Sequence, residues 1–81
     1  MKREYRLAKR STDIVPSYGI YEVFYDDEEQ ISFYTSQPIT PWGDIPEEIE
    51  HLTYQMLKAF DKPPLELDTL DRIISRKKMY K

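Results

Sequence analysis

Alternating hydrophobic and polar positions in the first half of the chain predict three β-strands. Residues 4–9 place Tyr5 and Leu7 on one side, with charged residues between them. After a loop at residues 11–17, residues 18–25 are dense in aromatic and β-branched side chains, and residues 31–36 resume the pattern. Because a short polar turn joins the last two strands, we expect a three-stranded antiparallel β-meander.

The apolar positions then change to a helical period. Between Ile45 and Phe60 they recur at spacings of three and four residues, which predicts one main α-helix. Asp44 is placed to cap this helix and Pro46 lies in its tolerant first turn. The helix ends before the two prolines at 63 and 64, because a proline disfavours helical geometry in the residue before it.

The last quarter of the chain carries a fainter helical pattern. A short extended piece at residues 65–67 precedes a weaker helix over residues 69–78, for which Asp68 is a suitable cap. The expected fold class is therefore α+β: a three-stranded antiparallel β-meander packed by one main α-helix, with a short, weaker C-terminal helix. We expect one small domain over residues 1–81, with a core in residues 4–67 and a basic tail in residues 68–81.

The central strand is apolar on both of its faces. Tyr21, Val23 and Tyr25 share one face, and the other face carries Tyr18, Ile20, Glu22 and Phe24. One helix covers only one face of a sheet. Either the second helix or a second chain must cover the other face, so this strand is the best sequence indication of an interaction surface.

Charge is distributed very unevenly along the chain. Residues 1–10 have a net charge of +4 and residues 58–81 a net charge of +3. Residues 11–57 contain ten carboxylates and neither lysine nor arginine. The total of −3 therefore hides an acidic middle between two basic ends. Such a field selects partners without deciding the fold, although the ends can also fold back and neutralise the middle.

Composition excludes several classes of site. The chain has no cysteine, which rules out disulfides, thiolate zinc sites and cysteine nucleophiles, and His51 is its only histidine. It has no apolar run near the roughly 20 residues of a membrane helix and no signal-peptide pattern. We expect a cytoplasmic protein that does not bind the membrane and needs no cofactor or metal.

Three segments of the chain form a distinctive layout: YGIYEVFYD at residues 18–26, a proline-rich joint ending in Gly43, and AFDKP at residues 59–63. In these segments the chain resembles a group of small uncharacterised bacterial and phage proteins. That group has the layout YGIxEVYYD … PxxPxGE … ALDKPVL, and the resemblance covers residues 4–67. The chain departs from it at Pro46 and in its longer basic tail. The resemblance implies the same order of strands and helix, and no activity, cofactor or catalytic residue.

No catalytic constellation stands out among the polar residues. His51 falls on the polar side of the main helix, which is typical of a solvated histidine. Glu22 shares a strand face with Ile20 and Phe24, so it is either a carboxylate with a raised pKa or a paired edge residue. The acidic cluster at residues 26–29 lacks the glycine and spacing of a calcium loop and is typical of a solvated turn.

The sequence therefore favours a non-enzymatic protein-binding module. Its aromatic sheet face would supply apolar contact area, and its acidic stretch would select the partner by charge. The simplest partner is a second copy of the chain. Trp42 either joins the core at the sheet edge or anchors a partner. The residues expected to bind the partner are Tyr18, Glu22, Phe24 and Tyr34 on the outer sheet face, with Trp42 beside that face.

The alternative is a role related to nucleic acid. A basic tail with phosphate contacts from Arg72, Arg76, Lys77 and Lys78 would bind nucleic acid directly. The acidic middle would instead act as a mimic that occupies a nucleic-acid-binding protein. The two classes differ in their response to salt, because phosphate binding weakens steeply as salt rises, whereas an apolar contact does not.

Overall fold

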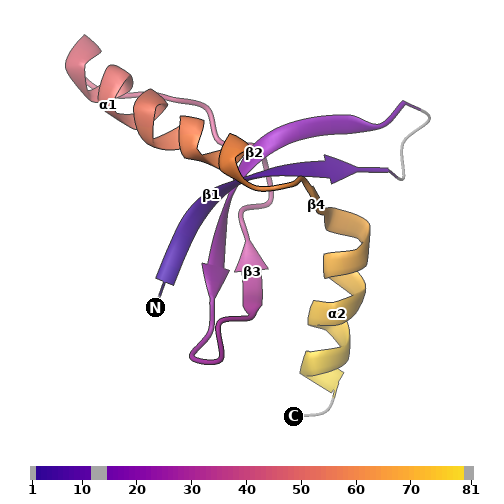
Figure 1. Cartoon of the computed structure of the whole chain (residues 1–81). Helices are drawn as coiled ribbons and strands as arrows, with labels where there is room; N and C mark the ends of the chain where they lie inside the picture. The colour runs from indigo at the N-terminus through magenta and orange to yellow at the C-terminus, as the bar shows by residue number, and fades with distance from the viewer. Residues whose placement is uncertain (1, 12–14, 80–81) are drawn as a thin grey trace.

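The computed structural model describes residues 2–11 and 15–79, with side chains up to residue 76. It has an α+β architecture in which a curled sheet lies between two helices (Figure 1). None of the helices in this described part is long and apolar enough to cross a membrane. Along the chain the elements are β1 (Lys2–Arg10), β2 (Ser17–Tyr25), β3 (Ile31–Tyr34), α1 (Pro46–Met56), the 3₁₀ helix η1 (Leu57–Asp61), β4 (Leu65–Glu66) and α2 (Leu67–Met79).

The sheet has four strands in the order β3-β2-β1-β4. β1 pairs antiparallel with β2 over nine residues, and β2 pairs antiparallel with β3, so the predicted meander is confirmed. The sequence predicted a short extended piece at residues 65–67, but not that it would pair with β1 as a fourth strand. Leu65 and Glu66 lie parallel to Ala8 and Lys9 of β1, and two residues are too few to show a strand period in the sequence.

The turn between β2 and β3 is held by its first carboxylate. Asp26 Oδ1 accepts hydrogen bonds from the backbone N–H groups of Glu28 (2.9 Å) and Gln30 (3.0 Å). Glu29 adopts a left-handed backbone with φ of 60°, which closes the turn. The acidic cluster thus works as a polar turn, as the sequence predicts.

α2 covers the sheet face that carries Tyr21 and Val23. Ala8, Tyr21 and Leu67 form a buried cluster, and Tyr34, Leu65 and Leu70 pack against it. α2 has 13 residues against 11 in α1, so the prediction of a short, weaker C-terminal helix is wrong in length. The helix is longer because β4 leads directly into it at Leu67, which is fully buried.

α1 begins one residue later than the predicted cap implies. Its N-cap residue is Ile45, which makes no side-chain cap, and Pro46 occupies the first turn. The backbone N–H of Asp44 instead donates to Glu48 Oε2 at 3.0 Å. Gly43 permits this closure, since a Cβ at that position would lie 2.7 Å from the Glu48 Cβ. The predicted side-chain cap from Asp44 is therefore wrong, although the backbone contact of Asp44 with Glu48 still closes the start of the helix.

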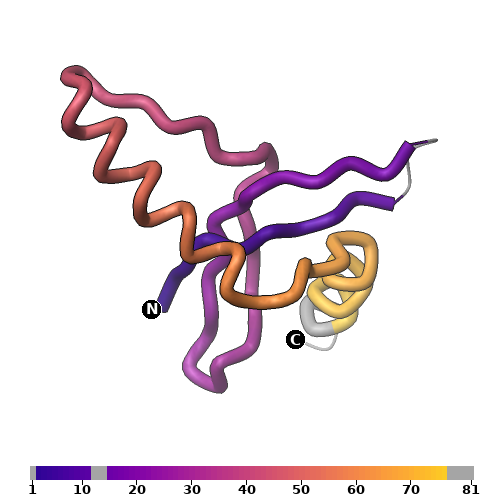
Figure 2. The backbone as a smooth tube through the Cα atoms, turned by 45° about the horizontal axis from the view of Figure 1, so that its top comes forward, coloured from indigo at the N-terminus to yellow at the C-terminus, as the bar shows by residue number. Residues whose placement is uncertain are grey.

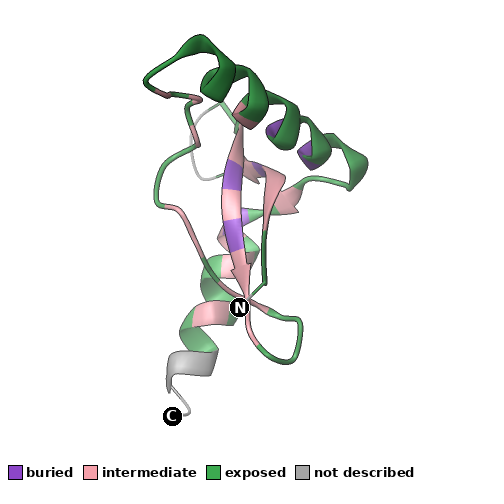
Figure 3. Ribbon diagram, turned by 90° about the vertical axis from the view of Figure 1, so that its left-hand side faces the viewer, coloured by how far each residue is buried: buried purple, intermediate pink, exposed green. Residues whose placement is uncertain are grey.

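Only the C-terminal half of α1 packs against the sheet. Met56 of α1 is buried and Leu52 is half-buried, and Ala59 of η1, which continues the helix, is buried as well. From residue 42 to residue 51 every residue is exposed except the half-buried Gly43. We call residues 42–51 the arm. Figures 1 and 2 show α1 projecting away from the sheet beside the extended segment that leads to it, and Figure 3 shows the exposure of both.

The arm makes the molecule elongated. Its radius of gyration is 14.0 Å and its principal extents are 44 × 35 × 23 Å. A compact domain of this length has a radius of gyration of about 12 Å. Figure 1 shows the arm and α2 at opposite ends of the molecule.

Candidate interaction surface

The arm exposes large apolar side chains that a helix usually buries. Trp42 is 75% exposed and Ile45 is 50% exposed, and Ile49 lies one turn further along the same row of α1. Ile45 and Ile49 belong to the same apolar stripe as Leu52 and Met56, from which the sequence predicted the helix. The stripe is real, but the sheet ends before the helix does, so the first half of the stripe has no partner among the described residues.

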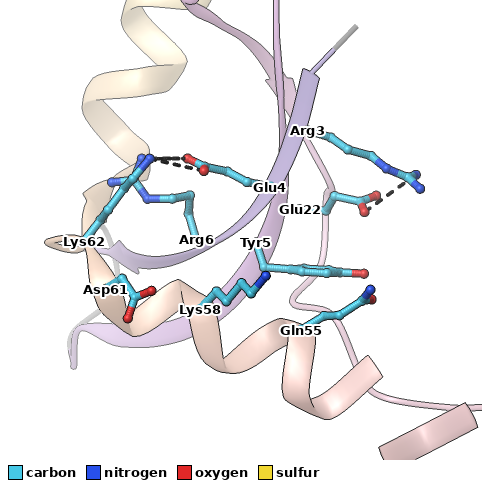
Figure 4. Close-up of a pocket in the computed structure, with 9 residues that line it drawn as sticks. All are labelled: Arg3, Glu4, Tyr5, Arg6, Glu22, Gln55, Lys58, Asp61 and Lys62. Atoms are coloured by element: carbon cyan, nitrogen blue, oxygen red, sulfur yellow. Dashed lines mark hydrogen bonds and ion pairs between the residues drawn. The ribbon is translucent and has the colours of Figure 1, made fainter. Parts of the chain in front are cut away.

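A groove runs between α1 and the outer face of the sheet, at the base of the arm. Two hollows meet there and share Tyr5 and Glu22, which lie opposite each other on β1 and β2. The apolar hollow is lined by Trp42 and Leu52 together with the segment after β3, residues 35–40. The charged hollow is shown in Figure 4, and its other lining residues are Arg3, Glu4, Arg6, Gln55, Lys58, Asp61 and Lys62.

Glu4 ties β1 to the end of η1 at one side of the charged hollow. Lys62 Nζ donates to both carboxylate oxygens of Glu4, at 3.1 and 3.2 Å, and the Tyr25 hydroxyl donates to Oε1 (Figure 4 shows the lysine contacts). Burial alone would raise the pKa of Glu4, but the hydrogen bonds from Tyr25 and Lys62 and the Lys62 and Arg6 charges lower it overall. The carboxylate is therefore held charged as a structural link.

Glu22 lies in the middle of the groove. Its carboxylate is 3.8 Å from the guanidinium of Arg3, which pairs with Phe24 across the strands. Burial and the Glu22 charge raise the pKa of the neighbouring Tyr5 phenol, so this hydroxyl stays protonated at neutral pH. Of the two interpretations of Glu22, the structure shows the paired residue. The groove wall thus combines an ion pair with a neutral hydroxyl, which suits binding by contact and hydrogen bonds.

A second polar network fixes α2 to the sheet on the opposite face. Arg10 donates to Asp68 Oδ1 (3.1 Å), to Asp71 Oδ2 (2.7 Å) and to the Tyr34 hydroxyl (3.0 Å). Tyr34 in turn donates to Asp71. Burial acts to raise the pKa of Asp71, but the Tyr34 hydrogen bond and the Arg10 guanidinium lower it overall. Tyr34 therefore serves the attachment of α2.

The structure brings together only some of the residues predicted to bind a partner. Tyr18, Glu22 and Phe24 lie on the outer face of β2, as expected. Tyr34 pairs with Val23 and so lies on the opposite face; its predicted place on the outer face is wrong. Its neighbour Phe33 takes that place and stacks on Phe24 with ring centroids 4.3 Å apart.

Trp42 is not part of the core. It stands on the arm, where it lines the apolar hollow with Leu52 and remains largely exposed. Of the two roles that the sequence allowed, the structure removes the core role. The remaining aromatic residue, Tyr18, is 61% exposed at the other end of β2, so the aromatic residues do not form one continuous patch.

The basic residues of the nucleic-acid alternative lie on α2. Arg72 and Arg76 are exposed and one helical turn apart, with the exposed Ile73 between them in sequence. The side chains of Lys77 and Lys78 lie outside the described part of the structure. Within that part neither Arg72 nor Arg76 forms an ion pair, so both remain available to a partner.

The remaining candidate residues form no recognisable reaction centre. His51 is exposed on α1, with its Nε2 atom 3.2 Å from the side-chain nitrogen of Gln55. Among the described residues no group of three or more histidine, aspartate or glutamate side chains could hold a metal ion. Comparison of the chain with protein-family models, with curated proteins and with solved structures finds no match.

Proposed function

We propose that the protein is a non-enzymatic protein-binding module whose binding surface is the arm together with the groove at its base. The observation that carries this proposal is the exposure of Trp42, Ile45 and Ile49 within one short projecting segment. A row of large apolar side chains in water is costly and marks a site that a partner covers. Tryptophan is also the residue type most often found to anchor such contacts.

Charge supplies the selectivity of this surface. Asp44, Glu47, Glu48 and Glu50 are interleaved with the exposed isoleucines along the chain and are exposed themselves, and we call these four residues the acidic rim. Apolar area at the centre and charge at the edge is the usual arrangement of a protein interface. The rim would speed the approach of a basic partner and disfavour an acidic one. The outer-face residues Phe24 and Phe33 would extend the apolar area for a partner that reaches along the sheet.

The geometry of the charged hollow supports binding rather than catalysis. Glu4 and Glu22 are each engaged with a cation from the same hollow, as the ion pairs of Glu4 with Lys62 and of Glu22 with Arg3 show. A general acid or base must instead be free to exchange a proton with a substrate. These carboxylates therefore act by holding the groove walls together.

Nucleic acid remains the second candidate, because Arg72 and Arg76 are exposed on one side of α2. Two arginines with the neighbouring lysines would contact phosphate groups at the end of the molecule opposite the arm. Such binding would weaken steeply with salt and would leave the arm uncovered.

Photo-cross-linking tests the proposal. A benzophenone amino acid in place of Trp42, irradiated in cells, should give one discrete protein adduct that persists after nuclease treatment. The matched control carries the same amino acid in place of Glu28, an exposed residue of the β2–β3 turn. An adduct pattern that is identical at both positions, or an adduct that nuclease removes, contradicts the proposal.

A further inference from the structure

The two ends of the molecule are complementary in chemistry. The arm combines Ile45 and Ile49 with the acidic rim, and no ion pair among the described residues reaches any rim carboxylate. The exposed side of α2 combines Ile73, 43% exposed, with Arg72 and Arg76. Among the described residues, each end thus exposes isoleucine beside charged side chains that form no ion pair, acidic on the arm and basic on α2, where the exposed Asp71 is paired with Arg10.

The chain also exposes more surface than a monomer of its mass usually does. Its accessible surface is 6347 Å², with a mass of 9.8 kDa. A folded monomer of this mass exposes about 5,200 Å². The surplus is roughly 1,150 Å², which exceeds the ~800 Å² that each partner buries in a standard stable interface. This excess reflects the elongated shape of the chain, in which the arm and one side of α2 lie open to a second copy.

We propose that the occupant of the arm is a second copy of this chain, with the arm of each copy lying along α2 of the other. This inference rests on the proposed function, because it names the partner of the same surface. In a two-fold dimer, if the arm contacts the partner's α2, then α2 contacts the partner's arm. Two elongated molecules lying side by side in opposite directions satisfy both contacts, because the arm and α2 stand at opposite ends (Figure 1).

Charge selects this arrangement over a contact between the two arms. Packing arm against arm would bring two acidic rims together, and like charges across an interface are unfavourable. Packing arm against α2 places Glu48 and Glu50 of one copy near Arg72 and Arg76 of the other, with Ile49 against Ile73. The acidic middle of the chain is then neutralised by a basic end, as its sequence layout suggests, but between molecules.

Charge reversal with rescue tests the pairing. Sedimentation of the purified chain should give twice the 9.8 kDa chain mass. We expect Arg72→Glu with Arg76→Glu to weaken dimerisation at least tenfold, because attraction becomes repulsion at both contacts. Glu48→Lys with Glu50→Lys should do the same. All four changes in one chain should restore the dimer. Asp27→Lys with Glu28→Lys, an equal charge change in the β2–β3 turn, is the control and should leave the dimer intact.

Disulfide trapping gives a second measurement that does not depend on charge. The chain has no cysteine, so a chain with Ile49→Cys and one with Ile73→Cys, mixed and oxidised, should form a disulfide with each other. A chain with Glu28→Cys in place of either is the control and should not. A wild-type chain that stays monomeric, a dimer indifferent to both reversals, or failure of the fourfold variant to recover overturns the inference. If the dimer fails these tests, a discrete photo-cross-link from position 42 to another protein still supports the proposed function. The absence of any such cross-link contradicts both the dimer and the proposed function.

Discussion

At the scale of single residues, the side chains between α2 and the sheet hold the fold together. Leu67 and Val23 are the largest fully buried side chains of the described part, and Leu67 joins Ala8 and Tyr21 in the core cluster. A core this small has few substitutes for any lost contact. The first residue of α2 therefore matters more to stability than its position near the end of the sequence suggests.

Replacing Leu67 should show this directly. Leu67→Ala removes buried methyl groups and leaves a cavity, so the free energy of unfolding should fall by about 2–5 kcal/mol. Urea denaturation followed by circular dichroism measures the change. Ser75→Ala at an exposed position of the same helix is the control, with an expected change within about 0.5 kcal/mol. Equal losses in the two variants would show that Leu67 is not in the core.

Glu4 should make stability depend on pH. Its pKa in the folded chain is lowered from 4.5, so the unfolded chain binds its proton more readily. Its contribution is therefore fully present above pH 4.5 and is lost as pH falls through the folded pKa. Glu4→Gln removes the charge contacts with Lys62 and Arg6 and should cost on the order of 1 kcal/mol at pH 7. The loss should shrink at pH 3, and an equal loss at both values would refute the role of the charge.

Sequence alone could not place every residue on its correct face. Alternation assigned Tyr18, Glu22 and Phe24 to one face correctly, because all three lie on one strand. Tyr34 lies on another strand, and its face depends on register. The pairs Phe24 with Phe33 and Val23 with Tyr34 set that register, and a shift between Phe24 and Tyr25 follows them. Alternation within a strand carries no information about register.

At the scale of elements, α2 is attached to the sheet by the apolar contacts of Leu67 and Leu70 and by one polar network. Arg10 from β1, Tyr34 from β3 and Asp71 from α2 meet at its first turns. The sequence predicted a weak helix here because the segment has few apolar positions. The pattern could not reveal that an arginine more than 60 residues away contributes to its stability.

Tyr34→Phe should loosen α2 without disturbing the rest of the sheet. The ring keeps its edge contact with Tyr21, but the hydroxyl links to Arg10 and Asp71 are lost. Each lost hydrogen bond costs about 0.5–1.5 kcal/mol. Backbone amides in α2 should therefore exchange with deuterium severalfold faster, while those in the β1–β2 ladder keep their rates. Uniform acceleration would instead indicate a global loss of stability.

For α1 the sequence pattern predicted the helix correctly but overstated how much of it packs against the sheet. Its apolar stripe and proline-marked start predicted the helix well, and the observed helix and 3₁₀ turn cover residues 46–61. What the stripe could not show is where the sheet ends. Periodicity identifies which side of a helix is apolar, but not whether this chain or another one covers that side.

At the scale of the whole molecule, the arm and α2 form two unequal ends of an elongated chain. Part of the acidic middle lies on the arm and the basic C-terminal end lies on α2, whereas the basic residues at the start of the chain lie on β1 inside the sheet. Local ion pairs such as that of Arg10 with Asp71 neutralise part of the charge within the chain. The acidic rim has no such partner in the described part, which is why the charge layout points outward to a second molecule.

The fluorescence of Trp42 tests the central claim, that the arm is a covered surface, most directly. Trp42 is the only tryptophan of the chain, so the whole tryptophan signal reports on the arm. If a second copy covers the arm, Trp42 in the concentrated protein should emit at shorter wavelength, and iodide should not quench this emission. The emission should move to longer wavelength on dilution, and Ile49→Glu should show the exposed spectrum at every concentration. Emission typical of an exposed tryptophan, fully quenched by iodide at all concentrations of the wild-type chain, would contradict covering of the arm by a second copy.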